Sequence, residues 1–240
     1  MLRLRVFGGL TLARGEENLT GAVSQRRRLA LLALLAVAQD TGMSRDKLLG
    51  WLWPESEADR ARHVLNQLLY AQRRQVGSAG LFLGRKTLRL NPAEIWTDVG
   101  AYREALRQGA LEEALTHYRG PFLDGFFMSE APEFERWVEE QRRQFADQSL
   151  AACVALAERA GERGDRAGAI QWWRRAAELD PLDTKVMLSL VAALAADGDR
   201  AGALRAARRH EQTLRSELDV DPDPRLRAAI ERLSSGAAPP

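Results

Sequence analysis

The sequence is poor in the residues that build metal centres and covalent cross-links. Its one cysteine, Cys153, excludes an intramolecular disulfide bond and a zinc site of the C-x-x-C type. The three histidines, His63, His117 and His210, fall in separate predicted helices without the H-x-x-x-H or H-E-x-x-H spacing of zinc sites. We therefore expect no metal and no cofactor, and the cysteine content indicates a cytoplasmic protein.

The chain also lacks a long hydrophobic run and a catalytic signature. Its longest apolar run, Leu29–Ala38, has ten residues, whereas a membrane-spanning helix needs about 20. Neither the G-x-S-x-G elbow of hydrolases nor the dinucleotide-binding G-x-G-x-x-G occurs. Residues 84–87 echo the end of a phosphate-binding loop, but the upstream glycine is missing and a predicted strand follows instead of a helix. We expect no catalytic residues, no enzymatic activity and no membrane partner.

What the chain does have is an ordinary globular composition with an uneven distribution of charge. Of its 240 residues, 45% are hydrophobic and 28% charged, enough to bury one or two cores. The net charge is +2, but residues 1–97 hold 15 basic and 8 acidic residues, and residues 98–240 hold 20 and 25. This split favours a nucleic-acid-binding part joined to an acidic, partner-binding part.

The first 97 residues show a change from alternating to helical hydrophobic spacing and back. The predicted elements are strands at 2–6 and 10–12, helices beginning near Ser24, Ser44 and Ser56, and a β-hairpin at 81–90. Ser44 is the expected N-cap of the second helix, and Ser56 with Asp59 predicts a capping box at the third. Strands, three helices and a hairpin in this order predict an OmpR-type winged helix-turn-helix domain over residues 1–97.

The remainder of the chain is helical and repetitive. Residues 163–170 recur at 197–204 with six identities in eight positions, and the spacing of 34 residues is that of tetratricopeptide repeats. Pro181 falls where such repeats place a proline. We predict an all-α, tetratricopeptide-like domain over residues 98–234 and a tail or linker at 235–240, so that the chain is predominantly α-helical overall.

The third predicted helix has a polar face suited to DNA. Its apolar side contains Ala61, Leu65 and Leu68, and the opposite arc collects cationic and amide side chains with few acids, which suit phosphates and base edges. A solvated helix face is the alternative. Cations also occupy the hairpin tip and the start of the first helix, where they oppose the helix dipole and so suggest a nearby phosphate or full solvation. The candidate DNA-binding residues are Arg60, Arg62, His63, Asn66, Gln67, Tyr70, Arg73 and Arg74 on the third helix, Arg85 and Lys86 at the hairpin tip, and Arg26, Arg27 and Arg28 at the first helix.

Several segments resemble the bacterial transcriptional activator domain (BTAD) regulators, which include the antibiotic regulatory (SARP) proteins. The segments that carry the resemblance are Leu52–Pro54, Ile95–Val99, Tyr118–Phe126, Ala131–Trp137 and Glu217–Pro224. The resemblance implies an OmpR-like winged helix that binds promoter DNA, and a tetratricopeptide-like domain for self-association or contact with the transcription machinery. It assigns a recognition-helix role to Arg62, Asn66, Gln67, Tyr70 and Arg73, and a wing role to Arg85 and Lys86. Ala71 and Gln72 depart from the family pattern, which has Arg and Leu there in many relatives.

From these observations we expect a transcription regulator, an activator, that reads double-stranded promoter DNA with the third helix and the wing. RNA polymerase and a second copy of the chain are the expected protein partners. The alternative is a protein-interaction scaffold in which the repeats matter and the winged helix has become a docking module with little DNA affinity. Binding to DNA with a strong dependence on salt would separate the two.

Overall fold

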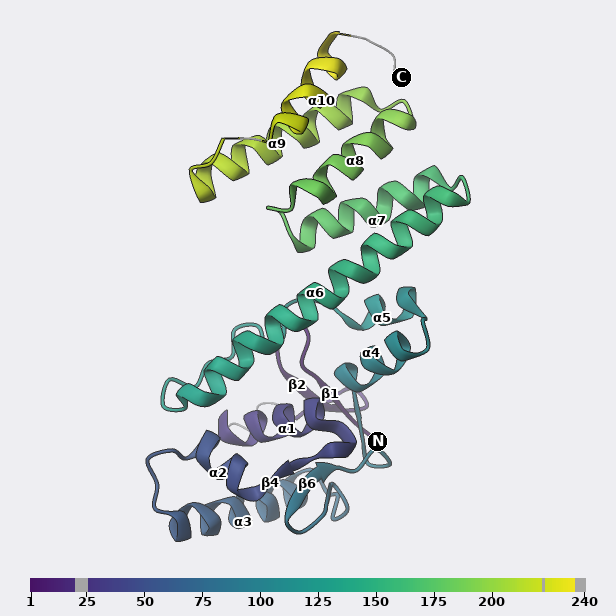
Figure 1. Ribbon diagram of the computed structural model, residues 1–240. Helices are drawn as coiled ribbons and strands as arrows, with labels where there is room; N and C mark the ends of the chain where they lie inside the picture. Colours follow the sequence, from purple (N-terminus) through teal and green to yellow (C-terminus); the bar gives the residue numbers. More distant parts are fainter. Residues whose placement is uncertain (20–25, 222, 236–240) are drawn as a thin grey trace. The chain divides into compact units, whose positions relative to one another are not determined.

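The computed structural model describes residues 1–19, 26–221 and 223–235, which form two compact units, Met1–Phe145 and Ala146–Pro240 (Figure 1). Ser24 and all of the predicted tail except Ser235 lie outside the described residues. The units divide within a helix, after Phe145, whereas the boundary predicted from the sequence lies after residue 97. The functional division at residue 97 stays a prediction.

The first unit begins with a four-stranded sheet of order β3-β2-β1-β7. Its strands are β1 (Leu2–Arg5), β2 (Thr11–Arg14), β3 (Glu17–Asn18) and β7 (Ile95–Thr97). Strand β1 runs antiparallel to β2 and parallel to β7, with Leu4 opposite Leu12 and Leu2 opposite Ile95. These four side chains are buried, so alternate residues of the short strands form one wall of the core.

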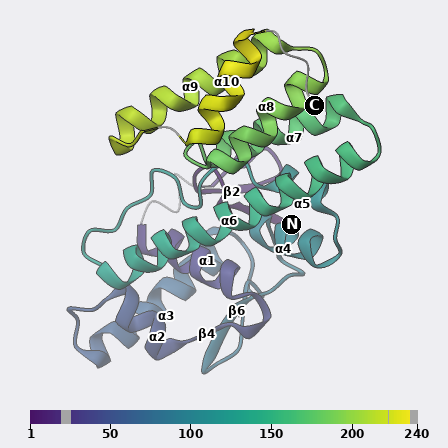
Figure 2. The same cartoon turned by 45° about the horizontal axis from the view of Figure 1, so that its top comes forward.

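Three helices and a hairpin follow the first strands, in the order predicted from the sequence (Figure 2). The elements are α1 (Arg26–Ala38), the 3-10 turn η1 (Gln39–Thr41), β4 (Met43–Ser44), α2 (Arg45–Leu52), α3 (Ala58–Gln75), β5 (Phe82–Leu83) and β6 (Thr87–Leu90). Strands β4, β6 and β5 form a second sheet, in that order. Helix α1 is buried continuously from Leu29 to Val37, which explains its uninterrupted apolar run.

The two predicted N-terminal helix caps have different outcomes. The Ser44 hydroxyl caps α2 by accepting a hydrogen bond from the Lys47 amide at 3.2 Å, as predicted. The capping box at Ser56 is wrong, because Glu57 is the N-cap of α3 and makes no side-chain capping bond. Ser56 therefore lies one residue too early to reach the free N–H groups of the first turn, and Asp59 pairs with Arg62 instead.

Residues beyond 97 complete the core of the first unit. They form α4 (Asp98–Arg107), α5 (Leu111–His117) and the first part of α6 (Pro132–Glu162). The Phe7 ring lies 5.3 Å from that of Tyr102 and 5.0 Å from that of Phe145, and Phe7 forms an isolated β-bridge with Phe122. This shared aromatic core is why the compact unit extends past residue 97.

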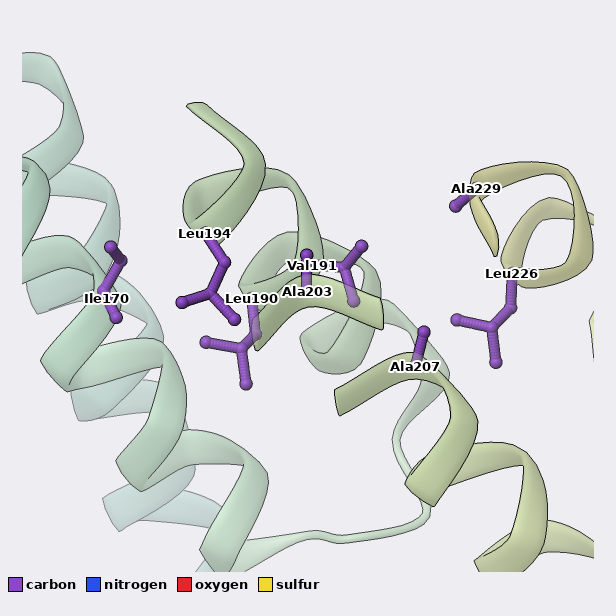
Figure 3. Close-up of a cluster of buried hydrophobic side chains, with 8 residues drawn as sticks. All are labelled: Ile170, Leu190, Val191, Leu194, Ala203, Ala207, Leu226 and Ala229. Carbon is purple, nitrogen blue, oxygen red and sulfur yellow. The ribbon is translucent and has the colours of Figure 1, made fainter. Parts of the chain in front are cut away.

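The second unit is entirely helical where the structure describes it. It contains the rest of α6, then α7 (Arg166–Leu179), α8 (Thr184–Ala196), α9 (Arg200–Leu218) and α10 (Pro224–Ser235). Its core is a cluster of eight small and branched side chains from α7, α8, α9 and α10 (Figure 3). The chain is therefore predominantly helical with a small N-terminal sheet region, as predicted, while the tetratricopeptide-like assignment stays a prediction.

The 34-residue repeat has a local structural cause. Asp165 and Asp199 are the N-caps of α7 and α9, and their carboxylates accept hydrogen bonds from the amides of Gly168 at 2.9 Å and Gly202 at 2.7 Å. A Cβ added at Gly168 would lie 2.2 Å from its capping carboxylate, and one at Gly202 would lie 2.1 Å away. Each repeat therefore requires glycine three residues after the capping aspartate.

Across the described parts of the chain, no helix combines the length and the apolar character that crossing a bilayer requires.

Candidate nucleic-acid interface

Helix α3 presents most of the predicted DNA-binding side chains on its exposed face. Its opposite side is buried through Ala61, Leu65, Leu68, Leu69 and Gln72. The exposed members of the predicted set are Arg60, Arg62, His63, Asn66, Gln67, Tyr70 and Arg74. Tyr70 is 64% exposed, which is unusual for a large ring and leaves it accessible to a ligand. One face of one helix thus offers cations, amides and an aromatic hydroxyl.

Some of these side chains are already oriented by their neighbours on α3. The Arg62 guanidinium pairs with Asp59 at 2.9 Å, and both groups are more than half exposed. The side-chain amide nitrogen of Gln67 lies 2.8 Å from Nε2 of His63, one helical turn away. Because such exposed pairs are weak in water, they orient these side chains, and the side chains can still break the pairs to bind phosphates or bases of DNA.

The β5–β6 hairpin places two cations at its tip. Arg85 and Lys86 are both exposed in the turn between the strands. Gly84 has a φ of 85°, and a Cβ there would lie 2.0 Å from the Thr87 carbonyl oxygen, so the tight turn requires glycine. The turn therefore holds the two cations beyond the end of the sheet, as a wing would need.

Arg45, which the sequence reasoning missed, connects the hairpin tip to α3. Its Nη1 donates to Oδ1 of Asn66 at 2.9 Å, and its Nε donates to the Arg85 carbonyl at 2.6 Å. Its backbone amide donates to the Lys86 carbonyl at 3.1 Å. A cation at the first position of α2 opposes the helix dipole, as do the arginines at residues 26–28 at the start of α1.

Arg73 lies apart from the exposed face. Its side chain is half-buried, its Nη2 donates to the Phe82 carbonyl at 3.3 Å, and its guanidinium carbon lies 5.8 Å from the centre of the Phe82 ring. Arg73 thus contacts the hairpin stem, while the next residue, Arg74, is exposed. A direct role of Arg73 in base recognition stays a prediction.

The three arginines at the start of α1 have unequal surroundings. Arg27 donates from Nε to the Leu52 carbonyl at 2.9 Å and lies 3.7 Å from the Glu130 carboxylate. Arg28 donates to the Gln75 side chain at 2.9 Å, whereas Arg26 is exposed. All three line one hollow of about 660 Å³ that also reaches Gln67 of α3. The structure therefore brings this cluster beside α3.

Among the described residues, no three or more His, Cys, Asp or Glu side chains lie close enough together to hold a metal ion. Cys153 is buried, and burial raises the pKa of its thiol to about 11, so it is protonated at neutral pH. The buried Asp98 carboxyl accepts hydrogen bonds from the backbone amides of Val6 and Phe7. It is part of the buried core and is not exposed at the candidate interface. The chemistry that the exposed residues support is the binding of an anionic polymer.

Comparisons with known proteins show relatives that are named as transcriptional regulators. The chain is 25% identical to the transcriptional regulatory protein EmbR of Mycobacterium tuberculosis over 240 residues, 89% of this chain and 58% of EmbR. It is 25% identical to the transcriptional regulatory protein MoaR1 of the same organism over 257 residues, 97% of this chain and 79% of MoaR1. The chain thus spans a little over half the length of the EmbR relatives that it matches.

A solved structure and a family model complete the comparison. The structure of Mycobacterium tuberculosis EmbR in complex with a low-affinity phosphopeptide has a TM-score of 0.66 at 23% identity, over 100% of this chain and 66% of that one, which shows a shared fold. The model of the bacterial transcriptional activator domain matches residues 98–234, more than half of the chain. The chain therefore belongs to the family of proteins with a bacterial transcriptional activator domain.

Proposed function

We propose that this chain is a transcription regulator, an activator, that binds double-stranded promoter DNA through its first 97 residues as a winged helix-turn-helix. Helix α3 enters the major groove, and the β5–β6 hairpin contacts the flanking backbone as the wing. The tetratricopeptide-like helices that follow serve self-association or contact with the transcription machinery, including RNA polymerase. The activity belongs to the cytoplasm and requires no cofactor.

One observation carries this proposal: the exposed face of α3 and the hairpin tip together present cations and amides, and Arg45 bonds to both. Asn66 and Gln67 have the side-chain amides that pair with adenine, and arginine is the commonest partner of guanine. Arg74, Arg85 and Lys86 are exposed cations suited to phosphates. Asp59 is the acidic residue of α3, and it pairs with Arg62.

The family supports the regulatory part of the proposal. Relatives that match most of this chain are named transcriptional regulatory proteins, and the matched domain is described as a transcriptional activator domain. The names describe those proteins. For this chain they favour gene regulation over the scaffold alternative, because the relatives align over 89% and 97% of it.

Binding of the 240-residue chain to DNA from its own upstream region tests the proposal. If it makes six to ten phosphate contacts, its affinity should fall roughly 10³–10⁵-fold between about 50 and 200 mM salt. The double substitution Arg74→Ala with Lys86→Ala should lower the salt slope by about 2, since each lost phosphate contact lowers it by about 1. Arg163→Ala, an exposed arginine of the second unit, is the matched control and should leave the slope unchanged.

A second pair of variants separates sequence reading from general attraction. Asn66→Ala and Gln67→Ala should each weaken specific binding by about 1–3 kcal/mol and leave binding to unrelated DNA almost unchanged. Absence of any DNA complex at low salt, in a chain that is folded by circular dichroism, would reject the proposal and favour the interaction scaffold.

A further inference from the structure

The second unit carries a groove at the edge of its core, and DNA binding does not explain this groove. Helices α7, α8 and α9 line a hollow of about 340 Å³, and α8 lies beside both of the other helices in the ribbon views (Figures 1 and 2). Figure 3 shows Leu190 and Leu194 of α8 between Ile170 of α7 and Ala203 of α9. The apolar lining of the groove consists of Ala177, Pro181, Met187, Leu190, Leu194 and Ala206.

The rim of the groove is cationic. Arg174, Arg205 and Arg209 are exposed and line it, and none of them forms an ion pair with a described residue. Two carboxylates, those of Glu178 and Asp199, also line the groove. Asp199 caps α9, so Glu178 is the carboxylate that offsets the three arginines of the rim. An apolar groove with such a cationic rim fits a segment that alternates apolar and acidic side chains.

Such a segment exists at the end of α9, and we name residues 217–220 the α9 tip. Leu218 is 51% exposed and Val220 is 50% exposed, so two large apolar side chains face solvent near one another. They are flanked by the exposed carboxylates of Glu217 and Asp219, neither of which forms an ion pair with a described residue. The left-handed conformation of Asp219, with a φ of 52°, ends the helix at this point.

The spacing of residues along α9 relates the groove to the tip. Arg205, Arg209, Thr213 and Glu217 follow one another at intervals of four and therefore form a single ridge of the helix. If two copies of α9 pack antiparallel on this ridge, Arg205 of each copy comes opposite Glu217 of the other. The same register brings the end of each α9, with the exposed Leu218 and Val220 beside it, to the start of the partner's α9, where Gly202 and Ala206 line the groove.

We propose that a second copy of this chain occupies the groove, in a two-fold symmetric dimer formed by antiparallel packing of the two α9 helices. Each α9 tip places Leu218 and Val220 at the partner groove, and its Glu217 pairs with the partner's Arg205. The interface is closed because each copy supplies one groove and one tip. This inference rests on the self-association part of the proposed function, which it deepens, and it does not depend on DNA binding.

Charge reversal tests the dimer without DNA. In sedimentation equilibrium of the full chain, the unmodified protein should be a dimer. Arg205→Glu and Glu217→Arg should each weaken it by on the order of 10–100-fold, because each places like charges together at two symmetric sites. An equimolar mixture of the two variants should recover a heterodimer, since at both symmetric contacts an acidic side chain of one variant then faces a basic side chain of the other.

Controls keep this experiment decisive. Arg208→Glu changes the same charge on an exposed residue of α9 outside the ridge and should leave the dimer intact. Circular dichroism of each variant should show unchanged helicity. An unmodified chain that stays monomeric, a dimer insensitive to both reversals, or a mixture of variants that does not recover would overturn the proposal. DNA-face variants such as Arg74→Ala should dimerise normally, so failure of the dimer and failure of DNA binding are separable.

Discussion

Nη1 of Arg45 donates a 2.9 Å hydrogen bond to Oδ1 of Asn66, which lies 21 residues further along the chain. The same guanidinium donates from Nε to the Arg85 carbonyl in the hairpin turn. A single side chain at the start of α2 therefore fixes both a candidate base-reading amide and the candidate wing. Since the bond uses the Asn66 oxygen, it leaves the Asn66 NH₂ group directed away from Arg45 as a donor.

Replacing Arg45 by alanine should therefore weaken specific DNA binding more than general DNA binding. Loss of the two hydrogen bonds frees the Asn66 side chain and the hairpin tip, and we expect on the order of a tenfold loss of affinity for the specific site. The measurement is a titration of specific and unrelated duplexes at one salt concentration. Lys47→Ala, which removes another exposed cation of α2, is the control for charge alone. Equal losses for the two duplexes would mean that Arg45 acts only as a phosphate contact.

The exposed face of α3 that forms the candidate interface could be predicted from the sequence, because helical periodicity alone separates the apolar and polar sides of the helix. Strands β3, β4 and β7, with two or three residues each, were not predicted, since such short strands show too little alternation. Arg45 was missed because the two groups that its guanidinium contacts, the Asn66 side chain and the Arg85 carbonyl, lie 21 and 40 residues away along the chain.

The structure also differs from the prediction on the polar face of α3. Periodicity predicts Arg73 on the polar face of α3, but its side chain is half-buried against strand β5, where it donates a hydrogen bond to the Phe82 carbonyl. The hydrophobic pattern of a helix does not show which other segment will cover its end. The compact unit also extends past residue 97 because Phe7 packs on Tyr102 and Phe145, a long-range contact that local patterns do not contain.

Adjacent arginines on α3 should have opposite phenotypes. Arg73→Ala removes a cation–π contact and a hydrogen bond to the hairpin, so we expect the free energy of unfolding to fall by about 1–2 kcal/mol. Arg74→Ala should leave unfolding nearly unchanged and weaken DNA binding in a salt-dependent way. Urea denaturation and DNA titration of both variants provide the comparison. A normal stability of Arg73→Ala together with a base-specific loss of binding would instead assign Arg73 to base recognition.

Glu130 should reduce DNA affinity through its position beside Arg27. Its carboxylate lies 3.7 Å from that guanidinium, in the hollow that also contains Arg26, Arg28 and Gln67. Glu130→Gln keeps the shape and removes the negative charge, so DNA affinity should rise by about 2–5-fold at low salt, with a smaller gain at high salt. Glu112→Gln, an exposed carboxylate of α5, is the control and should have no effect. An unchanged affinity would indicate that this hollow lies outside the DNA contact.

Asp98 makes the free energy of unfolding depend on pH, and the sign of this dependence shows whether burial or hydrogen bonding has the larger effect on its carboxyl group. Its carboxylate is 2% exposed and accepts hydrogen bonds from the amides of Val6, Phe7 and Val99 at 2.8–3.1 Å, which favour the charged form. Burial opposes them and is the larger effect, raising the pKa of Asp98 from 3.8 to about 6. The folded protein therefore holds this proton more tightly than the unfolded chain. The contribution of Asp98 to stability is then fully present below about pH 4 and is lost as the pH rises through about 6, by about 3 kcal/mol in total.

Urea unfolding of the unmodified protein and of Asp98→Asn between pH 4 and pH 7 isolates this group, because the amide does not titrate. The difference in unfolding free energy, unmodified minus variant, should fall by about 3 kcal/mol over that range. Other groups that titrate in both proteins cancel in the difference. If the difference rose with pH instead, the backbone hydrogen bonds would outweigh burial, and Asp98 would be a charged anchor between the end of β1 and α4.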